Sequence, residues 1–444
     1  MYQSFSYKNL PPYNSASRSI SCPSTEAPED RPFNGFRIAR TKNSLAVVSD
    51  VCGQLEAYEM HRIRSRARRP QDQSNFEKQV EALVCDLAHR EIAKPGAWLA
   101  VPLSKQFLGR KDRYRADVFR ETLPAVIEHM ASPEMEFLEL VKGKHYPFNQ
   151  ELSRQTVVRA GKRLKDRIED YQLVLNDFGV DKAQEIIILK DTKENRWDSG
   201  VLLQYSETNE TQAYREELTY INNWLEQADI DYNPIYDTNF VTDTTDRKLR
   251  RYFNNACFGH GGRLFGGFWQ HMRRMERQGI VIDGADTVTL DYGQMIARIL
   301  YGHAGAPFDH DDAYRIPGLE GCRDGIKKVF SAMLYADQRL TRMPQGCREL
   351  FPSKLSYAEV SDKIIGFHKP VAEFLYVGIG PVLTYLESKI LLTVLTKLIA
   401  QGITGLPIHD AVIVAEHHQD IAKKTMLQVF KDITGIDGLV SLDN

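Results

Sequence analysis

Apolar residues recur at helical spacing in three stretches of the chain. From residue 75 to 91 they repeat every three or four positions, which predicts an amphipathic helix with one buried face. The same pattern predicts a helix at about 119–130 and a long helix at about 207–228. These three segments are expected to pack one face against a core and to leave the other in solvent.

Short apolar and β-branched runs predict strands at 98–103, 137–141 and 185–189. A further helix is expected between the last two, near 156–174. Two more strand-like runs, later in the chain, each end on an aspartate. Together the elements predict an α+β fold.

Composition divides the chain into four segments. Residues 1–35 are rich in Ser, Pro, Asn and Tyr, and we expect a disordered arm there. Residues 36–165 are expected to form an α+β region, and residues 166–235 a mainly helical connector. The last segment, 236–444, carries the residues with the most specific chemistry.

Two features of the second segment bear on nucleic acids. The strand at 137–141 turns at Gly143 and follows a helix. This order is compatible with a DNA-binding winged helix and equally with a plain α+β scaffold. The basic run at 61–70 is either a solvated helix end or a contact with a phosphate backbone.

The composition excludes several classes of protein. The net charge of −2 and the sequence pI near 6.7 argue against a broadly basic nucleic-acid binder, although not against local basic sites. No apolar run reaches the roughly 18 residues that a membrane span needs, and no signal peptide is indicated. The six cysteines form no Cys-x-x-Cys pair, so we expect reduced thiols in a cytoplasmic protein without membrane partners.

Asp291 and Asp410 are the candidate metal ligands. Each follows a strand-like run, and the 119 residues between them mean that only tertiary folding can bring them together. Mg²⁺ prefers oxygen ligands, and two such ions about 3.5–4 Å apart stabilise the attacking and leaving oxygens of an in-line displacement. Taken alone, either aspartate could equally be a turn residue or a helix N-cap.

The helix at 323–335 supplies complementary charge. Arg323, Lys327, Ser331 and Tyr335 follow one another at intervals of four, which places them along one helix face. Cations at one end and an aromatic ring at the other suit a nucleoside triphosphate. A solvated surface helix with scattered cations would have the same spacing.

The order of these residues resembles the catalytic half of family A DNA polymerases, whose palm and fingers the phage-type single-subunit RNA polymerases share. The resemblance covers about residues 236–444 and includes four motifs in the same order. The motifs are Gly262-Arg263-Leu264 with Gln270, Asp291-Tyr292-Gly293-Gln294 with Arg298, the helix residues Arg323, Lys327 and Tyr335, and His409-Asp410. It implies a right-hand polymerase palm on an antiparallel sheet with helical fingers, and places 166–235 where a thumb would be.

The resemblance also implies a role for each matched residue. Asp291, Asp410 and the carbonyl of Tyr292 would hold two Mg²⁺ ions, with Mn²⁺ able to substitute, and Lys327 would assist catalysis. The nucleotide would be bound by Arg323, Lys327, Tyr335, Ile296, Ser331 and Gln294. The primer and template would be contacted by Arg263, Gln270, His409 and Arg298.

The chain departs from the family at several positions. Ile296 stands where the DNA enzymes have a glutamate that blocks the ribose 2′-hydroxyl and the RNA enzymes have a small residue. Gly293 replaces a serine, Ser331 an aromatic residue, and Ala411 the acid after the second aspartate. The first 235 residues show no such resemblance and no acidic set typical of a proofreading exonuclease.

Two charged features near these motifs stay open. The run Asp309-His310-Asp311-Asp312 is either a metal site or, as we expect, a solvated loop between palm and fingers. Glu387 lies in an apolar helix, where an unpaired charge is costly, so we expect it to face the cleft.

The sequence therefore leaves three functions to separate. The first is a primer-extending DNA polymerase without proofreading, acting on a DNA primer–template and nucleoside triphosphates in replication, as in a phage or mobile element. The second is an RNA polymerase, a primase or an enzyme that adds untemplated nucleotides, which the missing glutamate favours. The third is a DNA-binding replication initiator without enzymatic activity. The oligomeric state is left undetermined.

Overall fold

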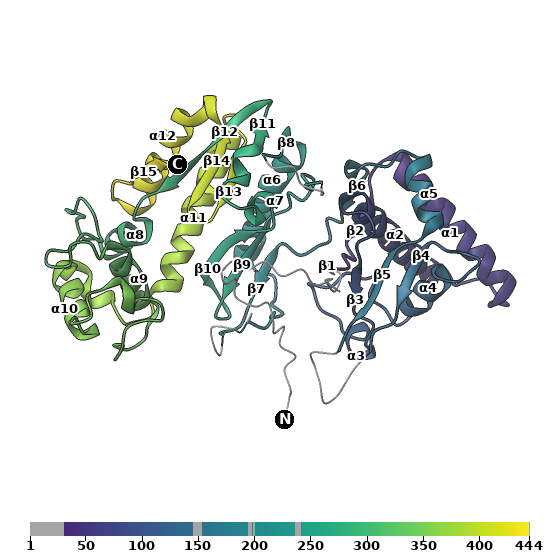
Figure 1. Ribbon diagram of the computed structural model, residues 1–444, viewed down its shortest axis with the longest axis horizontal. Helices are drawn as coiled ribbons and strands as arrows, with labels where there is room; N and C mark the ends of the chain where they lie inside the picture. The colour runs from purple at the N-terminus through teal and green to yellow at the C-terminus, as the bar shows by residue number, and fades with distance from the viewer. Residues whose placement is uncertain (1–30, 145–152, 194–197, 199, 236–240, 444) are drawn as a thin grey trace, which may run out of the picture. The chain divides into compact units, whose positions relative to one another are not determined.

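The computed structural model describes residues 31–144, 153–193, 198, 200–235 and 241–443. They form two compact units (Figure 1). The N-terminal unit contains residues 31–185 and 241–245, and the C-terminal unit contains residues 186–235 and 246–443. The predicted disordered arm covers residues 1–30, which lie outside the described residues, and residues 31–35, which belong to the N-terminal unit.

The N-terminal unit combines helices with two small sheets. Its helices are α1 (Lys42–Arg62), α2 (Pro70–Ala93), α3 (Lys105–Leu108), α4 (Leu123–Met130) and α5 (Lys162–Asp170). Its strands are β1 (Arg31–Pro32), β2 (Arg37–Ala39), β3 (Leu99–Val101), β4 (Leu138–Val141), β5 (Thr156–Ala160) and β6 (Phe178–Val180). The main sheet has the order β1-β3-β5-β4, and β2 pairs with β6.

The structure corrects the predicted boundary at residue 165. Helix α5 packs on α2, and β6 pairs with β2, so residues 166–185 belong to the N-terminal unit. The helix predicted at 156–174 is also partly wrong. Residues Thr156–Ala160 form a strand because their β-branched side chains favour the extended chain, and the helix begins only after Gly161.

The C-terminal unit is larger and holds the candidate chemistry. Its helices are α6 (Asn209–Gln227), α7 (Phe268–His271), α8 (Met295–Ala304), α9 (Arg323–Tyr335), α10 (Tyr357–Phe367), α11 (Gly380–Ile399) and α12 (Gln419–Thr434). Three strands form a small sheet of order β10-β9-β7, namely β7 (Ile187–Leu189), β9 (Arg250–Asn254) and β10 (Cys257–Phe265). The helices predicted at 207–228 and 323–335 are confirmed as α6 and α9.

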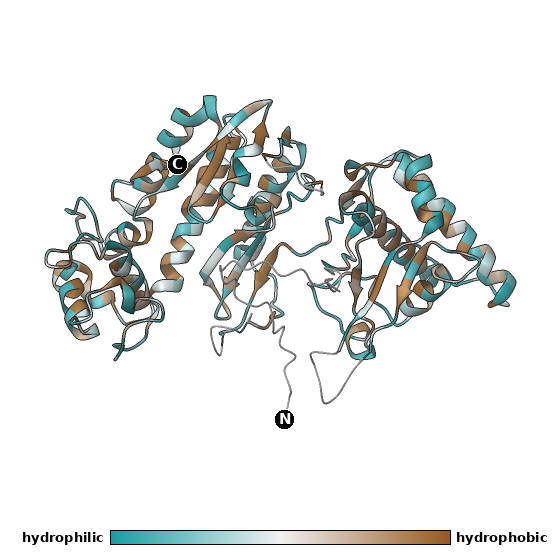
Figure 2. Ribbon diagram, viewed as in Figure 1, coloured by the Kyte–Doolittle hydropathy of each residue, from teal (hydrophilic) through white to brown (hydrophobic). Residues whose placement is uncertain are grey.

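A six-stranded antiparallel sheet forms the centre of this unit. Its strands are β8 (Ile230–Tyr232), β11 (Ile280–Ile282), β12 (Ala285–Tyr292), β13 (Leu406–Ile408), β14 (Ala411–Ala415) and β15 (Val440–Leu442). Strand β12 lies between β14 on one side and β11 and β15 on the other. Figure 2 shows these strands as largely hydrophobic, and the helices beside them as mixed. The prediction of an α+β fold with an antiparallel sheet agrees with this arrangement.

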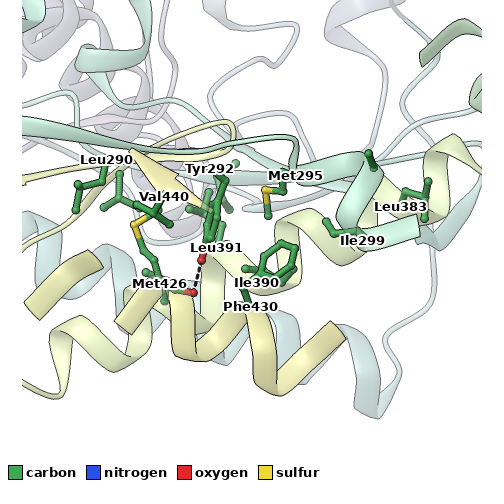
Figure 3. Packing of buried hydrophobic residues seen from close by; sticks show 14 of the residues in the cluster. Leu290, Tyr292, Met295, Ile299, Leu383, Ile390, Leu391, Met426, Phe430 and Val440 are labelled. Carbon is green, nitrogen blue, oxygen red and sulfur yellow. Dashed lines mark hydrogen bonds between the residues drawn. The ribbon is translucent and has the colours of Figure 1, made fainter. Parts of the chain in front are cut away.

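Buried side chains fix the orientation of β12. Leu290 and Tyr292 are almost fully buried, and Figure 3 shows them packed with Leu391 of α11 and Met426 of α12. The hydroxyl of Tyr292 donates a hydrogen bond to the carbonyl of Met426 at 2.7 Å. Successive residues of a strand point to opposite faces, so Asp291 projects from the face of the sheet away from these helices.

Candidate active site

Asp291 lies in β12, and Asp410 lies in the turn that enters its neighbour β14. Asp291 in β12 is directly opposite Ala411 of β14, and Asp410 occupies the two-residue turn that joins β13 to β14. The amide of Tyr292 donates a hydrogen bond to the carbonyl of Asp410 at 3.2 Å. The fold therefore brings Asp291 and Asp410 close together, as the predicted metal site required. Asp410 is, however, a turn residue and not the end of a strand.

The carboxylates of Asp291 and Asp410 are both partly buried. Within the described part of the chain, neither carboxylate accepts a hydrogen bond or forms an ion pair. Burial raises the pKa of Asp291 to about 7, and the negative charge of Asp410 adds to that rise, while Lys327 opposes it. Two like charges that share a partly desolvated site without donors are disfavoured unless a cation or a proton joins them.

A third acid that the sequence did not indicate also acts on Asp291. Strand β15 places Ser441 directly opposite Asp291, and the amide of Asp443 continues this pairing by donating to the carbonyl of Thr289 at 2.9 Å. The charge of Asp443 contributes to the raised pKa of Asp291. Asp443 itself pairs with Arg274 at 2.5 Å. Nothing local in the sequence marks Asp443, because only strand pairing brings it there.

Helix α9 presents its four spaced residues on one solvent-exposed face. Arg323, Lys327, Ser331 and Tyr335 are all exposed. The opposite face is buried through Ile326, Val329, Phe330, Met333 and Leu334. The helix begins at Arg323 and ends at Tyr335, as the spacing predicted. Of the four residues, Lys327 is the one whose positive charge lowers the pKa of Asp291.

The two ends of this face are tied to the rest of the C-terminal unit. Arg323 Nε donates to Asp312 Oδ2 at 2.6 Å, so the loop expected to be solvated holds the first residue of the helix. The hydroxyl of Tyr335 is 2.6 Å from Thr384 Oγ1 of α11. A Cβ on Gly380 would lie 2.7 Å from the ring of Tyr335, so glycine is what allows the ring to rest there.

Arg263 and Glu387 form a two-pronged ion pair near the aspartates. Arg263 Nε and Nη2 donate to the two carboxylate oxygens of Glu387 at 2.6 and 3.1 Å. Glu387 is buried, which raises its pKa, and Arg263 opposes that rise. The negative charge of Asp410 also acts on Arg263, which places Arg263 in the same site. Glu387 was expected to face the cleft; its side chain is instead buried, and its charge is paired with Arg263.

His409 precedes Asp410 in the turn with a positive φ of 52°, and its ring lies 6.0 Å from that of Phe265. Burial lowers the pKa of His409, and Arg263 adds to that effect. His409 therefore favours the neutral imidazole beside the aspartates.

Two predicted primer–template contacts are used inside the protein. The side-chain amide of Gln270 donates to the carbonyls of Leu264 and Pro407 and accepts from the amide of Gly266. Arg298 donates to the carbonyl of Asp437 at 2.8 Å, and its guanidinium stacks over Phe308. These side chains fix loops around the sheet, so the structure supports a packing role for both.

The departures from the polymerase motifs have partial structural reasons. A Cβ on Gly293 would lie 2.7 Å from Leu439, so the segment that leads into β15 leaves no room for the usual serine unless Leu439 shifts. Ile296 is partly buried and packs on the hydrophobic core from the first turn of α8. Ala411 is buried in β14, directly opposite Asp291.

Among the described residues, no group of three or more His, Cys, Asp or Glu side chains has the arrangement of a metal site, including the Asp309–Asp312 run. None of the described helices is sufficiently long and apolar to traverse a membrane.

Comparisons with known proteins assign no family. No protein-family model matches the sequence, and no curated protein matches it. Among solved structures, the chain is similar to the POL domain of Pol1 from M. smegmatis, determined as a complex with a DNA primer-template and dNTP. The TM-score is 0.28 and the identity 12%, over 57% of this chain and 57% of that one. At these values the likeness does not establish a family.

Proposed function

We propose that the chain is a template-directed nucleotidyltransferase, and specifically a primer-extending DNA polymerase. The observation that carries the proposal is the proximity of Asp291 in β12 to Asp410 in the adjoining β13–β14 turn, with the positive charge of Lys327 of α9 opposing the raised pKa of Asp291. An acidic pair with no hydrogen-bond donors among the described residues, faced by a cationic helix, suits a metal–triphosphate complex better than a structural role.

The donor set fits divalent magnesium. Asp291 and Asp410 offer hard carboxylate oxygens, and their shared negative charge is relieved by a cation. In this proposal the two carboxylates hold two Mg²⁺ ions, with the Tyr292 carbonyl as a further ligand. The ions supply electrostatic activation of the primer 3′-hydroxyl and neutralisation of the triphosphate.

The chain's own residues then position the reactants. Lys327 and Arg323 bind the triphosphate oxygens, and this charge neutralisation assists the departure of pyrophosphate when the 3′-oxygen attacks the α-phosphorus. Tyr335 lies at the far end of the same helix face, where a base or template nucleotide would stack. In this proposal Arg263, held by Glu387 and influenced by the charge of Asp410, contacts the primer terminus.

A second candidate, an RNA polymerase, a primase or an enzyme that adds untemplated nucleotides, is favoured by the absence of a glutamate at position 296. A glutamate at this position would block the ribose 2′-hydroxyl with its carboxylate, and isoleucine lacks that group. The bulk of isoleucine nevertheless leaves the 2′-hydroxyl without a hydrogen-bond partner. We place the DNA enzyme first because bulk and lost hydrogen bonding both act against a ribonucleotide.

The N-terminal unit is the proposed DNA-binding part. Helix α2, strand β3, helices α3 and α4, and the β4–β5 hairpin follow one another in the order that a winged helix has, with β5 between β3 and β4. The exposed cations Lys144 and Arg154 face each other across the hairpin. Like charges in that position destabilise a hairpin, and a phosphate backbone would offset the cost.

The basic run at 61–70 is less suited to that role. Arg68 pairs with Glu59 and stacks over the ring of Phe76, and Arg62 pairs with Glu134. Part of the run is therefore used for packing between α1 and α2.

Primer extension tests the proposed function. Purified protein is incubated with Mg²⁺ and a labelled primer–template, and each dNTP and each rNTP is supplied separately. Addition of only the complementary dNTP supports the DNA polymerase. Addition of complementary rNTPs moves the chain to the RNA enzymes, and addition regardless of the template base indicates untemplated transfer. No addition by a protein that binds DNA would favour the non-enzymatic initiator.

A further inference from the structure

A short loop, residues 311–314, is hydrogen-bonded on one side to Gln294. The side-chain oxygen of Gln294 accepts from the amide of Ala313 at 2.7 Å, and its nitrogen donates to the carbonyl of Asp311 at 3.3 Å. Gln294 is the N-cap residue of α8, with a left-handed φ of 56°, and lies three residues after Asp291. The loop is therefore fixed relative to the end of β12.

The other side of the loop holds the first residue of α9. Arg323 donates to Asp312 through Nε at 2.6 Å and through Nη2 at 3.4 Å. Asp312 also accepts from the amide of Tyr314 at 2.9 Å, so its carboxylate has a fixed place in the loop. The side chain of Asp312 is 15% exposed and that of Arg323 46% exposed. The carboxylate is thus mostly enclosed while the guanidinium reaches solvent.

The geometry leaves part of the guanidinium free. A guanidinium carries five N–H donors in a rigid plane, and a carboxylate on the Nε edge engages two of its nitrogens. Arg323 Nη1 donates to no other described residue. A phosphate can therefore bind through Nη1 and the second Nη2 proton while Asp312 keeps the opposite edge.

We propose that Asp312 is a positioning residue for the incoming triphosphate and acts by holding Arg323 in its binding orientation. The inference rests on the proposed function of this site. Gln294 fixes the loop to the strand that carries Asp291, and Asp312 fixes Arg323 to the loop. The loop thereby sets the separation between the metal-binding carboxylate and the triphosphate-binding guanidinium.

The direction in which one substitution changes the affinity for the nucleotide distinguishes positioning from competition. Asp312 is negative, so if it merely competed with the triphosphate for Arg323, its neutralisation would strengthen nucleotide binding. If it positions Arg323, Asp312→Asn releases a long side chain that must then be ordered by the nucleotide. Ordering one such side chain costs enough to raise the apparent Kd for the nucleotide about three- to tenfold.

Single-turnover extension of a primer–template by the full chain measures this effect. The apparent Kd for the complementary nucleotide and the maximal rate are determined for the wild type, Asp312→Asn, Arg323→Lys and the double variant. In Asp312→Asn we expect a raised Kd and a maximal rate within about twofold of the wild type. The reason is that Arg323 binds the triphosphate equally in the ground state and the transition state, so only affinity is lost. The double variant should bind no more weakly than Arg323→Lys, since lysine lacks the fork that Asp312 orients.

A matched control is the exposed Arg339–Asp362 pair, in which Asp362→Asn should leave both constants unchanged. An unchanged or lowered Kd in Asp312→Asn overturns the inference, as does a further loss in the double variant. In either case wild-type extension still supports the proposed function. A wild type that extends no primer removes the proposed function, and this inference with it.

Discussion

Replacing Asp291 by asparagine should stabilise the metal-free protein at neutral pH. The pKa of Asp291 is raised from 3.8 to about 7, chiefly by burial and then by Asp410 and Asp443. Between these two pH values the folded state holds a proton that the unfolded chain has lost. The free energy of unfolding therefore falls as the pH rises from about 4 to 7, because folding increasingly requires Asp291 to be ionised in a desolvated site. Above pH 7 this destabilisation by the ionised Asp291 is complete.

The size of the effect follows from the shift. A shift of about three pKa units corresponds to about 4 kcal/mol, at about 1.4 kcal/mol per unit. Asp291 is only partly buried, and solvent screening reduces this figure to about 2 kcal/mol. For a unit of this size, that corresponds to a rise in Tm of about 4–8 °C.

Calorimetry of the full chain in EDTA, at pH 4 and pH 8, measures the effect. Asp291→Asn should raise the Tm of the C-terminal unit at pH 8 and leave it nearly unchanged at pH 4. Asp286→Asn, an exposed aspartate on the same strand, is the matched control and should not change either value. A variant that is no more stable than the wild type at pH 8 would refute the reasoning that the carboxylates repel each other in a desolvated site.

Two further predictions concern the nucleotide and the DNA. Ile296→Glu should raise the dNTP/rNTP preference of extension, because a carboxylate rejects the 2′-hydroxyl; an unchanged ratio would place the sugar gate elsewhere, with Tyr335 the next candidate. Lys144→Ser with Arg154→Ser should weaken duplex binding and reduce its log–log salt slope by about 2, at about 0.9 for each lost phosphate contact. The matched pair Arg66→Ser and Arg69→Ser should leave that slope unchanged, and the opposite result would move the DNA contact to the basic run.

Local patterns were sufficient to predict some elements of the C-terminal unit, including α6, α9 and β7. Helix α9 has the predicted bounds because its apolar residues recur on one face and leave Arg323 and Tyr335 on the other. The pairing of Asp291 with Asp410 could be expected only through the resemblance, because 119 residues separate them.

Other features depend on tertiary contacts that no local pattern reveals. Asp443 is brought near Asp291 by the pairing of β15 with β12. Glu387 forms an ion pair with Arg263, which is far from it in the sequence. Gln270 is a motif residue that was predicted to contact the primer or template but is used inside the protein. An amide side chain in a motif can contact a ligand or the backbone, and here its hydrogen bonds go to the backbone around β10 and β13.

The most direct test of the central claim is primer extension by Asp410→Asn, with Asp420→Asn of α12 as an exposed control. The substitution keeps the size of the side chain and removes one of the two carboxylate charges proposed to hold the metal ions. We predict that nucleotide addition is abolished while the affinity for primer–template, measured in the same preparation, stays within about threefold. Nucleotide addition at a rate near that of the wild type would contradict the assignment of Asp291 and Asp410 as the catalytic pair.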